Sequence, residues 1–136
     1  YVGSLSSDVF YHALQVTLKS IFDRPFGWGF QGYELAFHDY NERNNYHRRE
    51  LGVYNSMDAS NTFFKIITEF GIISFFLYSA IFFILVSNKI SIENKVFLVP
   101  FIVTQSIRGA GYFNAAFILI LFLLLVIQFK KSKTSK

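Results

Sequence analysis

The chain has 136 residues, of which 52% are hydrophobic and 20% aromatic, a composition that is unusual for a soluble domain and indicates a membrane protein. Its basic residues flank the apolar segments: residues 61–136 hold eight Lys and Arg against two Asp and Glu. They therefore do not predict a nucleic-acid-binding face. The absence of cysteine excludes disulfides and thiolate metal sites.

Residues 1–60 are predicted to lie outside the membrane. Within them, residues from about 7 to 22 are predicted to form an amphipathic helix whose apolar face suits a bilayer surface. The apolar stripe of this helix consists of Phe10, Leu14, Leu18 and Ile21. The loop at residues 25–33, PFGWGFQGY, follows. Its three glycines permit positive φ angles or the close approach of a ligand.

Three apolar segments follow, and each is predicted to enter the membrane. Residues 61–87 suffice for a transmembrane helix, because about 20 residues cross about 30 Å of hydrocarbon. Residues 96–108 contain Pro100 and are too short to cross alone, which predicts a short or re-entrant helix. Residues 109–129 are predicted to form a second transmembrane helix, with a break at the glycines where this segment begins.

The lysines predict the topology of these segments. The turn at residues 88–95 and the tail at residues 130–136 belong on the cytoplasmic side. Residues 1–60 and Arg108 then share the opposite face. The expected fold is therefore all-α, a polytopic membrane protein with a large extracytoplasmic loop that carries an amphipathic helix. Because the chain opens on Tyr1 and shows no signal peptide, we interpret it as the C-terminal piece of a larger multi-pass protein.

Three motifs resemble the C-terminal part of the O-antigen ligase and O-antigen polymerase family. They are RPFGWGFQGYE (24–34), SNTFFKIITEFGIISFFLYS (60–79) and IRGAGYFN (107–114). In ligases of that family a catalytic His precedes the Asn that corresponds to Asn61. Here that position is Ser60, so the resemblance favours the polymerase-like branch and leaves the catalytic base unassigned.

The resemblance implies a glycosyltransferase that polymerises or ligates repeat units carried on a polyprenyl diphosphate. It implies the bacterial inner membrane, with residues 1–60 on the periplasmic side. It also implies a lipid-linked glycan and membrane lipid as partners, and it allows a chain-length regulator protein as a further one. Neither a metal nor another cofactor is expected, and no nucleic acid. The alternative is a transporter or flippase-like subunit that binds the same anionic lipid without forming or breaking a bond.

Arginine is the residue expected to hold the diphosphate, because its planar guanidinium binds phosphate oxygens in pairs and keeps its charge. Arg108 and Arg24 are the candidate catalytic arginines, since both are expected near the interface. For Arg108 the alternative is a snorkelling anchor. Arg48 and Arg49 either contact the substrate or belong to a solvated face.

The general base is left open among four side chains, of which imidazole has the most suitable pKa. The four are His38, His47, Glu34 and Asp39. Trp28 and Tyr33 are candidates for stacking on sugar rings, or else belong to an interfacial aromatic belt. The resemblance adds Asn61 as a substrate-binding residue.

Two further predictions concern side chains outside this candidate set. Lys65 and Glu69 are spaced i,i+4 and are expected to pair on one helix face near the lipid headgroups. His12 is expected at the interface.

Overall fold

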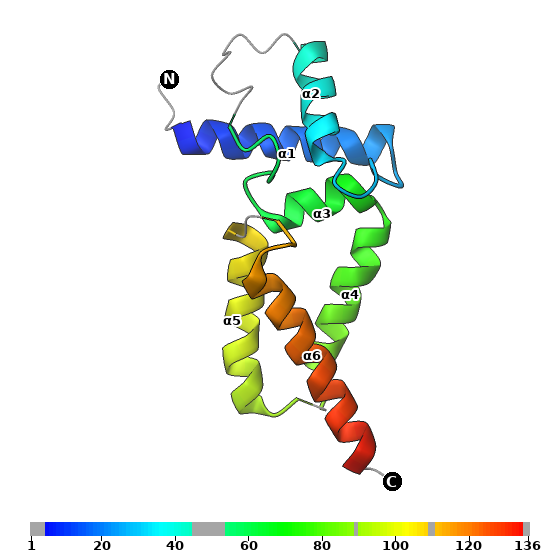
Figure 1. Ribbon diagram of the computed structural model, residues 1–136, viewed down its shortest axis with the longest axis vertical. Coiled ribbons are helices and arrows are strands. Elements are labelled where there is room, and N and C mark those ends of the chain that lie inside the picture. The colour runs from blue at the N-terminus through cyan, green and yellow to red at the C-terminus, as the bar shows by residue number, and fades with distance from the viewer. Residues whose placement is uncertain (1–4, 45–53, 89, 109–110, 135–136) are drawn as a thin grey trace.

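The computed structural model describes residues 5–44, 54–88, 90–108 and 111–134, and for residues 43–44 and 127–134 it describes the backbone alone. The described residues form helices and no strand, in agreement with the all-α expectation. The helices are α1 (Leu5–Asp23), α2 (Tyr33–Asn44), α3 (Thr62–Phe70), α4 (Ile73–Val86), α5 (Ile92–Arg108) and α6 (Ala115–Thr134). Figure 1 shows α1 lying across the molecule between α2 and α3, with α4, α5 and α6 extending away on the side of α3.

The predicted amphipathic helix is present as α1, but its buried face differs from the predicted apolar stripe. Phe10 and Leu18 of the predicted stripe are exposed. The buried face carries smaller or polar side chains, namely Val9, His12, Ala13, Val16, Thr17 and Ser20. Small side chains let α1 approach α3 closely, and the Thr68 hydroxyl donates a hydrogen bond of 3.1 Å to the Thr17 hydroxyl across that contact. His12 is 2% exposed, so its predicted place at an interface is wrong.

Helix α3 begins and ends where its sequence carries capping residues. At its start the Asn61 side chain accepts a hydrogen bond of 2.6 Å from the Phe64 N–H. At its end Gly71 adopts a φ of 54°, and its N–H donates to the Ile67 carbonyl. The chain therefore turns at Gly71, and α4 starts in a new direction (Figure 1).

The glycine-rich loop docks on the C-terminal end of α3. The N–H groups of Trp28 and Gly29 donate to the carbonyls of Thr68 and Glu69, at 3.0 and 2.9 Å. These carbonyls lie in the last turn of the helix, where no intrahelical partner is left. The positive φ predicted for this loop is confirmed at Gly27 and Gly29. The close approach is to the chain's own backbone, since a Cβ on Gly27 would overlap the Glu69 carbonyl.

Two hydrophobic cores result, with α3 between them. The first joins α1, α2 and α3 and is centred on Val16, Tyr33, Phe37 and Phe64. The second joins α4, α5 and α6 and is centred on Ile81, Leu98, Ile102 and Ile120. Helix α3 contacts α1, α2, α4 and α5, so it connects the two.

The prediction of a polytopic membrane protein is wrong. No helix within the described part of the chain is both long and apolar enough to cross a bilayer. The predicted span at 61–87 is divided at Gly71, which leaves α4 with 14 residues or about 21 Å. Helix α5 reaches about 26 Å and carries Glu93 and Lys95 near its start.

The last predicted span, residues 109–129, is also too short a helix to cross a bilayer. The predicted break is present, because α5 ends at Arg108 and α6 begins only at Ala115. There the Asn114 side chain accepts a hydrogen bond of 2.9 Å from the Ala116 N–H. Only about 22 Å of helix lies between Ala115 and the lysines that follow Phe129, against about 30 Å of hydrocarbon.

The predicted localisation, a multi-pass protein of the bacterial inner membrane, is wrong on the same finding. The assignment of residues 88–95 and 130–136 to the cytoplasm, and of residues 1–60 to the periplasm, depended on counting membrane crossings. Because no helix among the described residues is long and apolar enough to span a membrane, that count has no basis. The spatial relation between Arg108 and residues 1–60 must therefore be taken from the tertiary contacts themselves.

Candidate functional site

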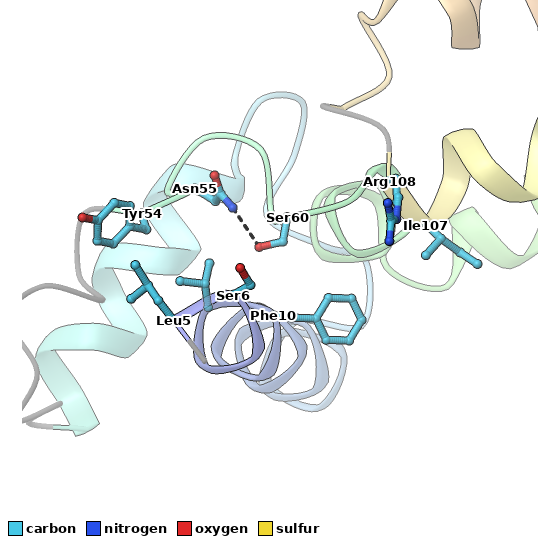
Figure 2. Close-up of a pocket in the computed structure, with 9 residues that line it drawn as sticks. Leu5, Ser6, Phe10, Tyr54, Asn55, Ser60, Ile107 and Arg108 are labelled. Atoms are coloured by element: carbon cyan, nitrogen blue, oxygen red, sulfur yellow. Dashed lines mark hydrogen bonds between the residues drawn. The ribbon is translucent and has the colours of Figure 1, made fainter. Parts of the chain in front are cut away.

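An open cavity of about 540 Å³ lies where three segments far apart in the sequence meet (Figure 2). Its walls are the start of α1, the turn at residues 54–60 and the end of α5. A volume of this order is typical of small-molecule sites. The polar side chains that line it are Ser6, Tyr54, Asn55, Ser60 and Arg108.

Arg108 is the charged residue among those lining this cavity. It is the last residue of α5, where the partial negative charge of the helix terminus favours a cation by about 0.3–1 kcal/mol. Its side chain is exposed, and in Figure 2 it lies across the cavity from Tyr54 and Asn55. Among the described residues no carboxylate forms an ion pair with it. The guanidinium can therefore bind an anion that enters the cavity.

The wall opposite Arg108 is a tight turn with a strained backbone. Asn55, Ala59 and Ser60 all have positive φ, at 56°, 56° and 61°. Residues other than glycine seldom adopt this conformation, and such strain is concentrated at functional sites. The Asn55 amide donates a hydrogen bond of 3.1 Å to the Ser60 hydroxyl (Figure 2). This wall offers neutral groups that both donate and accept hydrogen bonds.

A second, apolar groove of about 390 Å³ adjoins the first cavity. Phe10 and Ile107 line both spaces, so the two meet directly beside Arg108. The remaining lining of the groove comes from α3, α4 and α5 and includes Phe63, Phe64, Tyr78 and Ile102. The combined site places one positive charge and several hydroxyl or amide groups next to an extended apolar surface. That combination suits an amphiphile with an anionic head.

The structure brings together only part of the predicted site. Arg108 and Ser60 line the cavity, and Asn61 lines the adjoining groove. Asn61 is 2% exposed and its side-chain oxygen caps α3, so its observed contact is structural. Arg24 follows the far end of α1, about 20 Å along the helix from Phe10. Arg24 and Arg108 therefore do not converge on one ligand.

The other predicted residues that the structure describes lie on α2 or on the loop between α1 and α2. The Arg24 guanidinium stacks 3.9 Å from the centre of the Trp28 ring, a cation–π contact that occupies the face Trp28 would offer to a sugar. Tyr33 has 0% exposure and so has no surface with which to contact a ligand. His38 is exposed and lies 4.0 Å from Glu34. The predicted residues His47, Arg48 and Arg49 lie outside the described residues.

The sequence predicts two members of a buried group of ionisable side chains and misses the third. The predicted Lys65–Glu69 pair is confirmed, with 3.9 Å between Lys65 Nζ and Glu69 Oε1, but both residues are buried rather than interfacial. The Tyr112 hydroxyl donates to Glu69 Oε2 at 2.5 Å. Burial and this hydrogen bond to Glu69 raise the pKa of Tyr112, which keeps its phenol neutral. The i,i+4 spacing revealed the pair, but nothing local to Tyr112 predicted the third member.

Comparison of the chain with protein-family models, curated proteins and solved structures finds no match. Within the described residues there is also no group of three or more His, Cys, Asp and Glu side chains that could hold a metal ion. The chemistry of the site must therefore be inferred from its own residues.

Proposed function

We propose that this chain acts in glycan assembly and transfers a sugar chain from a polyprenyl diphosphate carrier to an acceptor hydroxyl. The observation that carries the proposal is the position of Arg108, at the junction between a polar cavity and an apolar groove. A polyprenyl diphosphate has two corresponding parts, an anionic head that suits the polar cavity and a hydrocarbon tail that suits the apolar groove. The resemblance of residues 24–34, 60–79 and 107–114 to O-antigen polymerases and ligases supports the same substrate class.

In this proposal the acceptor oxygen forms a bond to the anomeric carbon as the sugar–phosphate bond breaks, and the proton of the acceptor hydroxyl passes to the departing diphosphate. Arg108 binds the diphosphate and stabilises the negative charge that develops on it. Stabilisation of a leaving group's charge is often the largest contribution to catalysis. The groove beside Phe10 and Ile107 takes the first isoprene units. The Asn55 and Ser60 side chains face the sugar end of the substrate, where neutral hydrogen-bonding groups match its hydroxyls.

Such a carrier resides in membrane lipid. We assign the contact with that lipid to exposed apolar side chains rather than to a spanning helix. Helix α4 has no charged residue and exposes Phe75, Phe76, Phe82 and Phe83. An apolar surface of this kind marks a contact with a protein or a membrane.

A second function is favoured by the composition of the cavity. Its lining, as far as the structure describes the chain, contains neither a carboxylate nor an imidazole that could act as general base. Binding or transport of a lipid-linked glycan without bond formation needs no such group. The two functions differ in what a cell lacking the protein accumulates. Single repeat units on the carrier indicate a missing polymerase, long chains on the carrier indicate a missing ligase, and unchanged carrier-linked glycan indicates transport.

Substitution of Arg108 tests the proposal. Arg108→Lys keeps the charge but loses the paired hydrogen bonds to phosphate, and we expect a loss of about 1.5–3 kcal/mol, or roughly 10- to 150-fold, in affinity for farnesyl diphosphate. Isothermal titration calorimetry on the purified chain measures this affinity. The ladder of lipid-linked glycan in cells shows whether glycan assembly is impaired. Arg24→Lys is the matched control and should leave the affinity unchanged. Wild-type affinity and glycan in Arg108→Lys, at normal protein level, would refute the proposal.

A further inference from the structure

We propose that the buried Lys65–Glu69 pair, together with Tyr112, positions Arg108 and the turn at residues 54–60 on either side of the cavity. This inference rests on the proposed function, since it concerns the binding of a diphosphate by Arg108. None of the three residues lines the cavity. They are positioning residues, which act on the ligand through the two walls that they hold.

The burial of the pair is the first observation. Lys65 is 6% exposed and Glu69 is 0% exposed, although both are charged residues. Desolvation makes a buried ion pair costly for a fold, and apolar residues of similar size often serve equally well. The retention of both charges in the protein interior therefore calls for a role beyond packing.

Lys65 holds the turn that forms one wall. Its ammonium group donates a hydrogen bond of 2.6 Å to the Met57 carbonyl and lies 3.9 Å from Asp58 Oδ1. Both contacts fall between Asn55 and Ser60, the two residues of this turn whose strained backbones line the cavity. A strained turn persists only when surrounding contacts determine it, and Lys65 supplies such contacts from inside the protein.

Glu69 holds Tyr112, which lies four residues beyond Arg108 in the sequence. It accepts the hydrogen bond from Tyr112 and also accepts one of 3.3 Å from the Tyr33 N–H. Lys65 lies against Gly111, the residue before Tyr112, because a Cβ on Gly111 would meet its side chain at 3.3 Å. The two charged residues are one helical turn apart on α3, so a single rigid helix sets the spacing between the two walls.

A double-mutant cycle on the purified chain tests whether the pair acts through Arg108. Lys65→Met alone leaves Glu69 as an unpaired buried charge and is liable to unfold the protein. The test therefore uses Lys65→Met/Glu69→Leu, which removes both charges at similar volume, and Tyr112→Phe, which removes only the hydroxyl. Each is combined with Arg108→Gln, and the dissociation constant for farnesyl diphosphate is measured by calorimetry after circular dichroism has shown the variant to be folded.

We expect each positioning variant to weaken binding by about tenfold or more, as a displaced binding group does. We also expect that, in the Arg108→Gln background, neither variant weakens it further. Wild-type affinity in the folded positioning variants would overturn the inference, as would losses that simply add to that of Arg108→Gln. An unchanged affinity in Arg108→Gln itself would instead refute the proposed function, and this inference with it.

Discussion

Asn61 is predicted to bind substrate, but in the structure it caps a helix. The resemblance to glycan polymerases implies a substrate-binding role, whereas the structure shows its side chain bound to the Phe64 N–H at the start of α3. The residue also lines the apolar groove, where a polar side chain already occupied by the backbone has little to offer a hydrocarbon ligand. The capping contact accounts for an asparagine at this place.

Replacement of Asn61 separates the two roles. Asn61→Ala removes the cap, and we expect the free energy of unfolding to fall by about 1–2 kcal/mol, measured by urea denaturation. Asn61→Ser keeps a capping oxygen and should restore most of this loss. If Asn61→Ser were as stable as the parent chain but bound farnesyl diphosphate much more weakly, the residue would have a role at the ligand as well.

The glycine-rich loop and α3 form one unit. The loop satisfies backbone carbonyls at the end of α3, and the Ile72 N–H donates a hydrogen bond of 2.8 Å back to the Pro25 carbonyl. This reciprocal docking brings the two backbones within contact at Gly27 and Gly71. The sequence revealed that glycines were needed here but not that their neighbour would be the protein itself.

Gly27 and Gly29 provide a matched pair for testing this contact. Both have positive φ, at 82° and 88°, but a Cβ at Gly27 would overlap the Glu69 backbone whereas nothing lies near Gly29. We expect Gly29→Ala to cost about 1 kcal/mol of stability from backbone conformation alone, and Gly27→Ala to cost clearly more. Thermal or urea unfolding measures both. Equal losses would show that the loop does not dock as described.

The burial of tyrosines affects how the stability of the protein depends on pH. Burial raises the pKa of the Tyr33 phenol and raises that of Tyr78 to about 12. An unfolded chain releases these protons near pH 10, while the folded chain still holds them. The folded state is then destabilised as the pH rises above about 10, since the unfolded state binds fewer protons there.

Tyr33→Phe tests this expectation. Above pH 10 each buried tyrosine lowers the free energy of unfolding by up to about 1.4 kcal/mol per pH unit. The free energy of unfolding of the variant should therefore fall less steeply between pH 10 and 11. Near pH 7 its stability should stay close to that of the parent chain, because the Tyr33 hydroxyl has no hydrogen-bond partner among the described residues. Urea denaturation at several pH values measures the slope. Tyr11→Phe, at an exposed position, is the control.

Local sequence patterns were enough to predict the helical class, the positive φ of Gly27 and Gly29, the Lys65–Glu69 pair and the break after Arg108. These features depend on residues close together in the chain, through backbone conformation and helical spacing. The sequence misjudged the membrane spans, because hydropathy does not show that Gly71 divides one apolar run into two helices pointing in different directions. It also misjudged the face of α1, because the packing of α3 selected small side chains over large apolar ones.

Which candidate residues share a site depends on tertiary contacts that no local pattern predicts. Arg24 and Arg108 are equivalent in chemistry, yet the length of α1 separates them, while the contact of α3 with α1 and α5 brings Arg108 to Ser60 and the start of α1. Tertiary contacts likewise place Tyr33 in the interior and Tyr112 beside the buried pair. Such outcomes depend on contacts between residues tens of positions apart, whose formation is set by the packing of whole helices rather than by any local pattern.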